Sequence, residues 1–264
     1  MTGNWNLMQK APLCGAFLLL SLICSPKNTA LASCAPYKRG VEQEVAHVYD
    51  GDTVRLADGR KVRLIGINTP ELGHDGKIDE PGARQALQHL LSIVRASQQR
   101  VYLLPGTQQK DRYGRQLAHL YDKDGNNISE SLLRDGMGYV ITIPPNLRNI
   151  ACYQAAESLA RQNRRGLWQS ASVPLKADKL SGKEAGFYLI RGRIGRIGNS
   201  RKALWLNLVQ GPALRIDRRD LPEFADLDTD DLVGKRLEVR GWIYRRSGQQ
   251  RMNVRHPSSI HWLD

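Results

Sequence analysis

The sequence lacks the motifs that several large classes of enzyme require. None of its 6 histidines stands in an H-x-H or H-E-x-x-H arrangement, and no two cysteines have the spacing of a zinc site. There is also no G-x-x-x-x-G-K-[ST] loop, which would cradle nucleotide phosphates. Zinc-dependent catalysis and hydrolysis of nucleoside triphosphates are therefore not expected.

Long apolar runs are scarce too, and the clearest one lies near the N-terminus. Residues 13–24 form an apolar run that is too short to span a bilayer comfortably. Lys10 precedes this run, and Ala30-Leu31-Ala32 fits an A-x-A cleavage site. We therefore predict a signal peptide at residues 1–32 and an exported mature chain, periplasmic or secreted, without stable membrane insertion.

The sequence has 4 cysteines, and cleavage after Ala32 would leave Cys34 and Cys152. Two cysteines in an exported chain indicate one disulfide, with two free thiols as the less favoured alternative. Leu31-Ala32-Ser33-Cys34 also resembles a bacterial lipobox, which would make the protein a lipoprotein anchored through Cys34 and leave Cys152 unpaired. We rank this second, because a lipobox normally adjoins the apolar run.

Basic residues outnumber acidic ones, and the formal net charge is +13. The excess is densest in residues 172–264, which carry 18 basic and 11 acidic residues, a net charge of +7. Such a surface attracts polyanions without sequence preference. The alternative is a solvated basic surface that only aids solubility.

The order of predicted elements indicates an α+β protein. Residues 44–67 read as strands around an Asp58-Gly59 hairpin turn, and further strands are predicted at 101–104 and 116–121. Helices are predicted from Pro81-Gly82, from a cap at Asn127, and over about 150–165. Five short strands with three packed helices fit an OB-fold barrel.

The rest of the chain indicates a second domain. Residues 33–171 would form the first domain, 172–186 a polar linker, and 187–264 a basic β-rich domain with about five strands. We expect that domain to be a second small β-barrel, with an OB-like topology as one option.

Two short stretches combine carboxylates with arginines. The first runs through Asp50-Gly51-Asp52-Thr53, Arg63 and Asn68-Thr69-Pro70-Glu71, and the second is Asp111-Arg112-Tyr113-Gly114-Arg115. Carboxylates hold hard cations or activate water. An arginine can bind a phosphate through two parallel hydrogen bonds. Together these residues indicate the chemistry of phosphodiester cleavage.

With Gly166-Leu167-Trp168, these motifs stand in the order typical of the staphylococcal nuclease (thermonuclease) family, which residues 45–168 resemble. The resemblance implies an OB-fold nuclease domain and one Ca²⁺ ion, with Mg²⁺ or Mn²⁺ as alternatives. Its ligands would be the Asp52 carboxylate, the Asn68 side chain and the Thr69 backbone carbonyl. Asn68 departs from the family, which more often has Asp there, so we expect weak metal binding.

The resemblance also assigns the reacting groups. Glu71 would orient or deprotonate the attacking water, while Arg63 and Arg115 would bind the charge that builds on the phosphate. Arg112 and Tyr113 match a pair that contacts a neighbouring phosphate. As an alternative, Arg63 could form an internal salt bridge with Asp52 or Glu71.

One hairpin of the second domain mixes aromatic and basic residues. OB domains stack bases on such surfaces, although the aromatics could equally cover the barrel wall or a domain interface. The candidate nucleic-acid contacts are Arg240, Trp242, Tyr244, Arg245 and Arg246.

The sequence thus predicts an exported, metal-dependent nuclease that acts on DNA and RNA as a monomer, with no protein partner identified. The first alternative is a non-catalytic protein that binds nucleic acid or another polyanion on a nuclease fold, and Asn68 is the residue that favours it. The second is a second barrel that anchors the protein to a partner or an envelope polymer.

Overall fold

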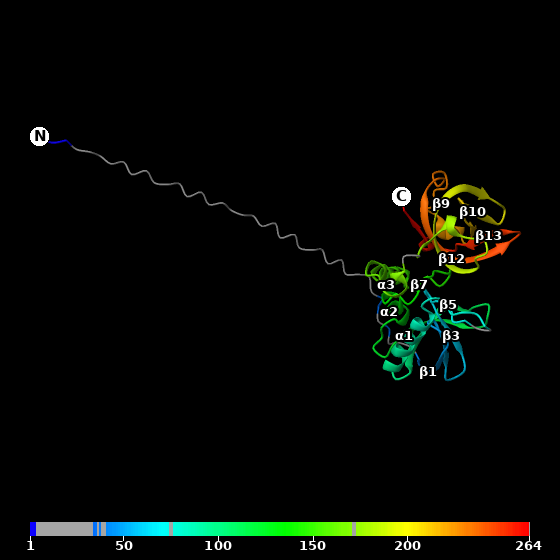
Figure 1. The fold of residues 1–264 in the computed structure, drawn as a ribbon. Coiled ribbons are helices and arrows are strands. Elements are labelled where there is room, and N and C mark those ends of the chain that lie inside the picture. Colours follow the sequence, from blue (N-terminus) through cyan, green and yellow to red (C-terminus); the bar gives the residue numbers. More distant parts are fainter. Residues whose placement is uncertain (4–33, 36, 38–40, 74–75, 171–172, 264) are drawn as a thin grey trace. The chain divides into compact units, whose positions relative to one another are not determined.

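The computed structural model describes residues 1–3, 34–35, 37, 41–73, 76–170 and 173–263 (Figure 1). Apart from residues 1–3, the predicted signal peptide and the Ala30-Leu31-Ala32 cleavage site lie outside the described residues. The chain divides into two units, 1–30 and 31–264, and both barrels belong to the second. No helix in the described ranges has the length and apolarity that a membrane crossing needs.

The first barrel is closed, in the strand order β1-β2-β3-β6-β5, as the predicted OB-fold requires. β3 and β6 run parallel and the other neighbours antiparallel. Alternating apolar residues such as Val54 and Leu56 point inward and are buried. The strands are β1 (Glu42–Val48), β2 (Thr53–Leu56), β3 (Lys61–Leu64), β5 (Arg100–Lys110) and β6 (Gln116–Tyr121).

Three helices pack with this barrel: α1 (Ala83–Ala96), α2 (Ile128–Arg134) and α3 (Ile150–Gln162). The predicted cap is confirmed, because Asn127 Oδ1 accepts a hydrogen bond from the Glu130 N–H at 3.0 Å. Gly136, the predicted end of α2, has φ 74°, which favours glycine. The short strands β4 (Ile67–Asn68) and β7 (Tyr139–Val140) pair with each other beside the barrel.

A disulfide joins Cys34 to Cys152 at the start of α3, which confirms the predicted pair. Its Cα atoms are 5.2 Å apart, and the two residues are separated by 118 positions in the sequence. Both cysteines are buried in the core of the first barrel.

The second barrel repeats the topology of the first, although the sequence shows no clear repeat. Its strand order is β9-β10-β11-β13-β12, closed by pairing of β12 with β9, and β11 and β13 run parallel. This matches β1-β2-β3-β6-β5 strand for strand, so the second barrel is OB-like. The strands are β9 (Gly186–Asn199), β10 (Ala203–Leu208), β11 (Ala213–Asp217), β12 (Arg236–Arg246) and β13 (Gln249–Asn253).

Part of the stretch predicted as a linker is structured. The short strand β8 (Leu175–Lys176) pairs with β9, and Ala177 is buried in the second core. Polar neighbours concealed these contacts in the sequence. At the other end, β14 (Ile260–Trp262) pairs with β12. The remaining elements are short 3₁₀ helices at Gly166–Gln169, Ala177–Lys179, Leu221–Phe224 and Pro257–Ser259.

Candidate active site

The turn that leads into β2 places Asp52 beneath the surface of the first barrel. Its side chain is buried, and its Oδ2 atom accepts hydrogen bonds from the Thr69 N–H at 2.9 Å and hydroxyl at 3.1 Å. Asp52 Oδ1 accepts from the Thr53 hydroxyl at 3.1 Å. These bonds join the start of β2 to the loop that carries Glu71.

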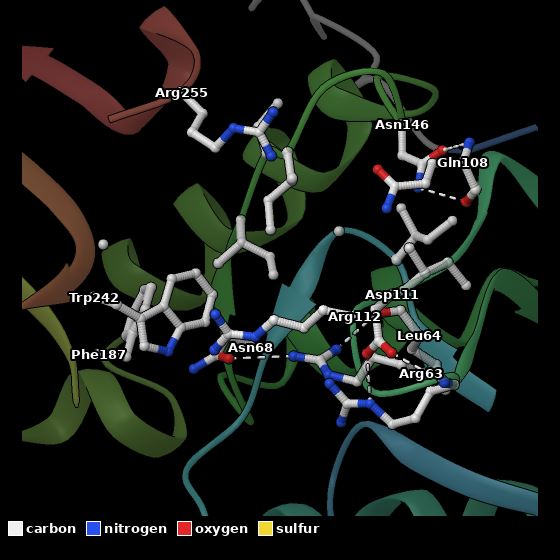
Figure 2. Close-up of a pocket in the computed structure, with 18 of the residues that line it drawn as sticks. Arg63, Leu64, Asn68, Gln108, Asp111, Arg112, Asn146, Phe187, Trp242 and Arg255 are labelled. Atoms are coloured by element: carbon white, nitrogen blue, oxygen red, sulfur yellow. Dashed lines mark hydrogen bonds and ion pairs between the residues drawn. The ribbon is translucent and has the colours of Figure 1, made fainter. Parts of the chain in front are cut away.

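Arg63 projects from β3 into this group, and its guanidinium is almost fully buried (Figure 2). Nη2 lies 2.9 Å from Asp52 Oδ2 and donates to Asn68 Oδ1 at 3.2 Å. Nη1 donates to the backbone carbonyls of Leu64 and Ile67 at 2.7 and 2.8 Å. The internal salt bridge considered above is therefore present, and Arg63 contacts both side chains predicted to hold a metal.

Asp50 is an acidic neighbour of this site to which the sequence assigned no role. Its Oδ1 atom accepts a hydrogen bond from the Asp52 N–H at 2.8 Å. Burial, with the nearby carboxylates of Asp52 and Glu71, raises the pKa of Asp50 to about 7.

Glu71 follows Pro70 at the rim of the site. Partial burial, followed by the charges of Asp52 and Glu80, raises the pKa of the Glu71 carboxyl above its ordinary value despite the opposing influence of Arg63 and Arg115. The Glu71 N–H donates to Glu80 Oε2 at 3.0 Å, which holds the loop.

Arg115 is held in place by Asp111 across the turn between β5 and β6. Asp111 Oδ2 accepts from Arg115 Nε at 2.7 Å, and Oδ1 accepts from the backbone N–H groups of Tyr113 and Arg115, both at 2.9 Å. Although burial acts in the opposite direction, these bonds keep the pKa of Asp111 below its ordinary value. Gly114, with φ 79°, permits the turn.

Arg112 and Tyr113 project from the same turn. Arg112 Nη2 donates to the Tyr113 hydroxyl at 2.5 Å, and its guanidinium carbon lies 4.7 Å from the centre of the Tyr113 ring. The Tyr113 side chain is exposed, so a cationic and aromatic surface faces outward beside Arg115.

A pocket of about 1090 Å³ brings most of these residues together and extends onto the second barrel (Figure 2). Asp52 and Thr69 do not line the pocket, although Asp52 forms an ion pair with the lining residue Arg63. Three predicted residues of the second barrel also lie outside the lining: Tyr244, Arg245 and Arg246. The predicted residues that line it are Arg63, Asn68, Glu71, Arg112, Tyr113, Arg115, Arg240 and Trp242.

Two of the predicted contacts on the second barrel have different environments. Arg240 is largely buried and donates hydrogen bonds to the Glu157 carboxylate of α3 at 2.6 and 2.7 Å. Its positive charge is therefore neutralised by an ion pair that joins the second barrel to α3. Trp242 is 43% exposed, and its ring stands edge-on to Phe187 at 5.1 Å. We therefore retain Trp242, and not Arg240, as a candidate substrate contact.

Several pocket residues had no signal in the sequence. Phe187 stacks on Tyr139 of β7 with ring centres 5.6 Å apart, and its ring also packs edge-on against Trp242. Arg219 and Arg255 add positive charge from the second barrel. These residues stand in separate strands and loops, so nothing in the sequence grouped them with the motifs of the first barrel.

The oxygen atoms around Arg63 fit a hard cation. Asp52 and Asn68 supply carboxylate and amide oxygens, which Ca²⁺ accepts, although Arg63 Nη2 contacts both groups in this structure. Among the described residues, no three His, Cys, Asp or Glu side chains form a metal-binding group. An ion would therefore depend on amide, backbone and water oxygens as well.

Comparison with known proteins identifies a family for most of the first domain. Residues 61–170 match the model of the family described as "Staphylococcal nuclease homologue". This segment contains Arg63, Glu71 and Arg115, and ends at the boundary between the two barrels.

Three relatives show how far the similarity extends. A protein of Escherichia coli O157:H7 named "Uncharacterized endonuclease" is 31% identical over 134 residues, which cover 50% of this chain and 79% of the relative. The "Thermonuclease" of Staphylococcus intermedius is 30% identical over 134 residues, covering 50% and 78%. "Endonuclease YhcR" of Bacillus subtilis (strain 168) is 28% identical over 135 residues, covering 47% and 11%.

The similarity thus covers nearly four-fifths of two relatives that are named as nucleases, and the family model spans the residues that carry Arg63, Glu71 and Arg115 of the pocket. The chain is a nuclease that belongs to the staphylococcal nuclease family.

Proposed function

We propose that this nuclease is exported and hydrolyses phosphodiester bonds of both DNA and RNA with the help of a divalent cation, Ca²⁺. The observation that carries the proposal is the convergence of Arg63, Glu71 and Arg115 in one pocket beside Arg112 and Tyr113. Phosphate groups are common to DNA and RNA and carry no base sequence, so a pocket that binds phosphate through arginines suits an enzyme that acts on both.

Each side chain has a step that its position permits. Glu71 lines the same pocket as Arg63 and Arg115 and lies close enough to interact with both charges, so it can accept a proton from a water that attacks a phosphate bound there. Arg115, oriented by Asp111, can donate two parallel hydrogen bonds to the equatorial phosphate oxygens as charge builds there. The Arg112 and Tyr113 pair can bind an adjacent phosphate and set the register of the chain.

Arg63 needs a rearrangement before it can bind phosphate. Both of its terminal nitrogens are engaged with Asp52, Asn68 and backbone carbonyls. A cation bound by Asp52, Asn68 and the Thr69 carbonyl would supply the positive charge that Arg63 now provides. Arg63 would then be free to turn its donors toward the substrate.

The test uses the mature chain, residues 33–264, with plasmid DNA and with RNA, in Ca²⁺, Mg²⁺ or chelator. We expect Glu71→Gln to lower turnover by about two to four orders of magnitude, the usual contribution of a general base. Glu44→Gln on β1, an exposed acid outside the pocket, is the matched control and should leave turnover unchanged. Normal turnover of folded Glu71→Gln would contradict the assignment.

Export is proposed from the signal-peptide pattern and is supported by the Cys34–Cys152 disulfide, since such bonds persist in oxidising compartments. Intact mass of the natural product should show a chain that starts at Ser33 and carries the disulfide. A diacylglycerol mass on Cys34 would instead establish the lipoprotein alternative.

The engagement of Arg63 gives one specific reason to keep the non-catalytic alternative. A guanidinium that permanently neutralises Asp52 would leave a protein that binds nucleic acid without cleaving it. The same assay separates the two functions, because this alternative predicts binding with no cleavage in any of the three conditions.

A further inference from the structure

The second barrel has a basic pocket of its own, outside the catalytic pocket. It has a volume of about 320 Å³ and is built by the β9–β10 loop, the end of β12 and the outer face of three strands. Its lining residues are Ser200, Arg201, Lys202, Trp205, Arg215, Arg246 and Arg251. We call this set the β10–β13 pocket.

Cations surround an aromatic ring in this pocket. The guanidinium carbons of Arg251 and Arg215 lie 5.0 and 5.8 Å from the centre of the Trp205 ring. The indole N–H is bonded to the Ser200 hydroxyl at 3.2 Å, which fixes the plane of the ring. The Trp205 ring is thus oriented by Ser200 and lies close to two guanidinium groups, a combination of aromatic and basic groups that nucleic acids bind.

The charge of the pocket is poorly compensated by the protein. Arg215 forms an ion pair with Asp217, but the Nε atom of Arg251 is buried and has no hydrogen-bond partner among the described residues. A buried donor without a partner costs free energy, and neighbouring like charges repel each other. An anionic ligand in the pocket would relieve the repulsion between these charges.

The place of the pocket in the barrel also indicates a ligand. In chain order, β10 and β11 are the second and third of the five strands of this OB-like barrel. The β9–β10 loop joins its first and second strands, and the β12–β13 loop joins its fourth and fifth. OB-folds bind oligonucleotides and oligosaccharides on this face and with these loops. The basic residues therefore occupy the surface where the fold binds extended polymers.

Strand β13 connects this pocket with the catalytic one. Arg251 lines the β10–β13 pocket and Asn253 lines the catalytic pocket, while Met252 between them is buried. Arg251 and Asn253 thus share the outer face, about 7 Å apart at two residues' rise. Arg215 of β11 stands opposite Asn253 in the register. A bound chain could pass from one pocket to the other within a short distance.

We propose that the β10–β13 pocket is a binding site for single-stranded nucleic acid that leads the strand along β13 into the catalytic pocket. A single strand offers both phosphates for the arginines and an unpaired base for Trp205, whereas a duplex hides its base faces. This inference rests on the proposed nuclease function. It adds a preference for single-stranded substrates and a second binding site on the second barrel.

Binding is measured on the full mature chain in chelator, where cleavage should not interfere, using fluorescence anisotropy of a labelled oligothymidylate and of a labelled duplex. Arg201→Gln/Lys202→Gln removes two exposed charges from a loop, so folding should be unaffected. We expect weaker binding of the single strand and a salt dependence that flattens by about 0.7 per lost phosphate contact. Lys179→Gln/Lys183→Gln removes the same charge outside both pockets and should have little effect.

Trp205→Ala tests base stacking separately, and we expect it to weaken single-strand binding by about 5- to 150-fold. Equal losses in the two double variants, or unchanged binding in Arg201→Gln/Lys202→Gln and Trp205→Ala, would overturn the proposal. An equal loss for the duplex would show that the pocket recognises phosphate without selecting single strands. If binding falls as expected but no variant or wild type cleaves, the site stands and the proposed function fails.

Discussion

Arg240 on β12 of the second barrel donates hydrogen bonds at 2.6 and 2.7 Å to the buried carboxylate of Glu157 on α3 of the first. The same carboxylate accepts from the Val140 N–H at 2.7 Å. Nearby, Arg161 of α3 donates to both oxygens of Glu238 on β12 at 2.6 and 2.7 Å. These contacts fix the second barrel as one wall of the catalytic pocket.

Removing Arg240 should destabilise the protein strongly. Arg240→Leu leaves the Glu157 carboxylate buried without its cation, a change that typically costs about 3–5 kcal/mol. Chemical denaturation of the full chain measures the loss. Arg245→Leu alters an exposed neighbour and should stay within about 0.5 kcal/mol of wild type. A similar, small effect of both substitutions would show that the ion pair does not hold the barrels together.

The Cys34–Cys152 disulfide should stabilise the folded protein because it closes a long loop of the chain. A cross-link across 118 positions restricts the unfolded chain, and loss of a native disulfide typically lowers the free energy of unfolding by about 2–5 kcal/mol. Cys34→Ser/Cys152→Ser should therefore unfold at lower denaturant concentration. Equal stability of oxidised wild type and the double variant would contradict this expectation.

His119 should make the protein less stable in acid. Burial, assisted by Arg148, lowers the pKa of His119 from 6.5 to about 4 in the folded state. Between these values the unfolded chain binds a proton that the folded chain does not, so stability falls as pH drops from about 6.5 to about 4. The shift corresponds to about 3 kcal/mol.

The matched variant is His119→Gln, which cannot titrate and retains a polar group beside the Tyr153 hydroxyl, now 2.7 Å from Nδ1. Its free energy of unfolding should change less than that of wild type over the same pH range. Parallel curves would show that His119 is not the group responsible.

Asn68→Asp should strengthen metal binding. The substitution places a second carboxylate beside Asp52, and hard cations bind more tightly as ligand charge increases. The Ca²⁺ concentration for half-maximal cleavage should fall, and Ca²⁺ should raise the melting temperature more than in wild type. If both responses equal those of wild type, Asn68 is not a ligand.

The strands and helices of the first barrel could be predicted from sequence because local signals there agree. Asp58-Gly59 marks the hairpin, alternating residues such as Val54 and Leu56 mark the buried face, and Asn127 caps its helix. The resemblance to the staphylococcal nuclease family then singled out Arg63 and Arg115 as candidate site residues. Each of these signals depends on residues close together in the chain.

Other features depend on contacts between distant residues, and the sequence could not show them. Arg240 looked like a free cation in an aromatic hairpin, yet its partner Glu157 is 83 residues away. Phe187 had no motif and owes its role to Tyr139. Ala177 lay in an apparent linker because only its packing against the second core reveals its place.

We propose that the catalytic groups of a phosphodiesterase meet in the pocket between the two barrels. Single-turnover cleavage of a labelled single strand by Arg115→Gln tests it most directly, with the exposed Arg60→Gln as the matched control outside the pocket. We expect a rate about 10²- to 10³-fold below wild type for Arg115→Gln, because the variant loses a hydrogen-bond donor to the negative charge that develops on the phosphate. The control should cleave at the normal rate. Equal rates for folded Arg115→Gln and wild type would contradict it.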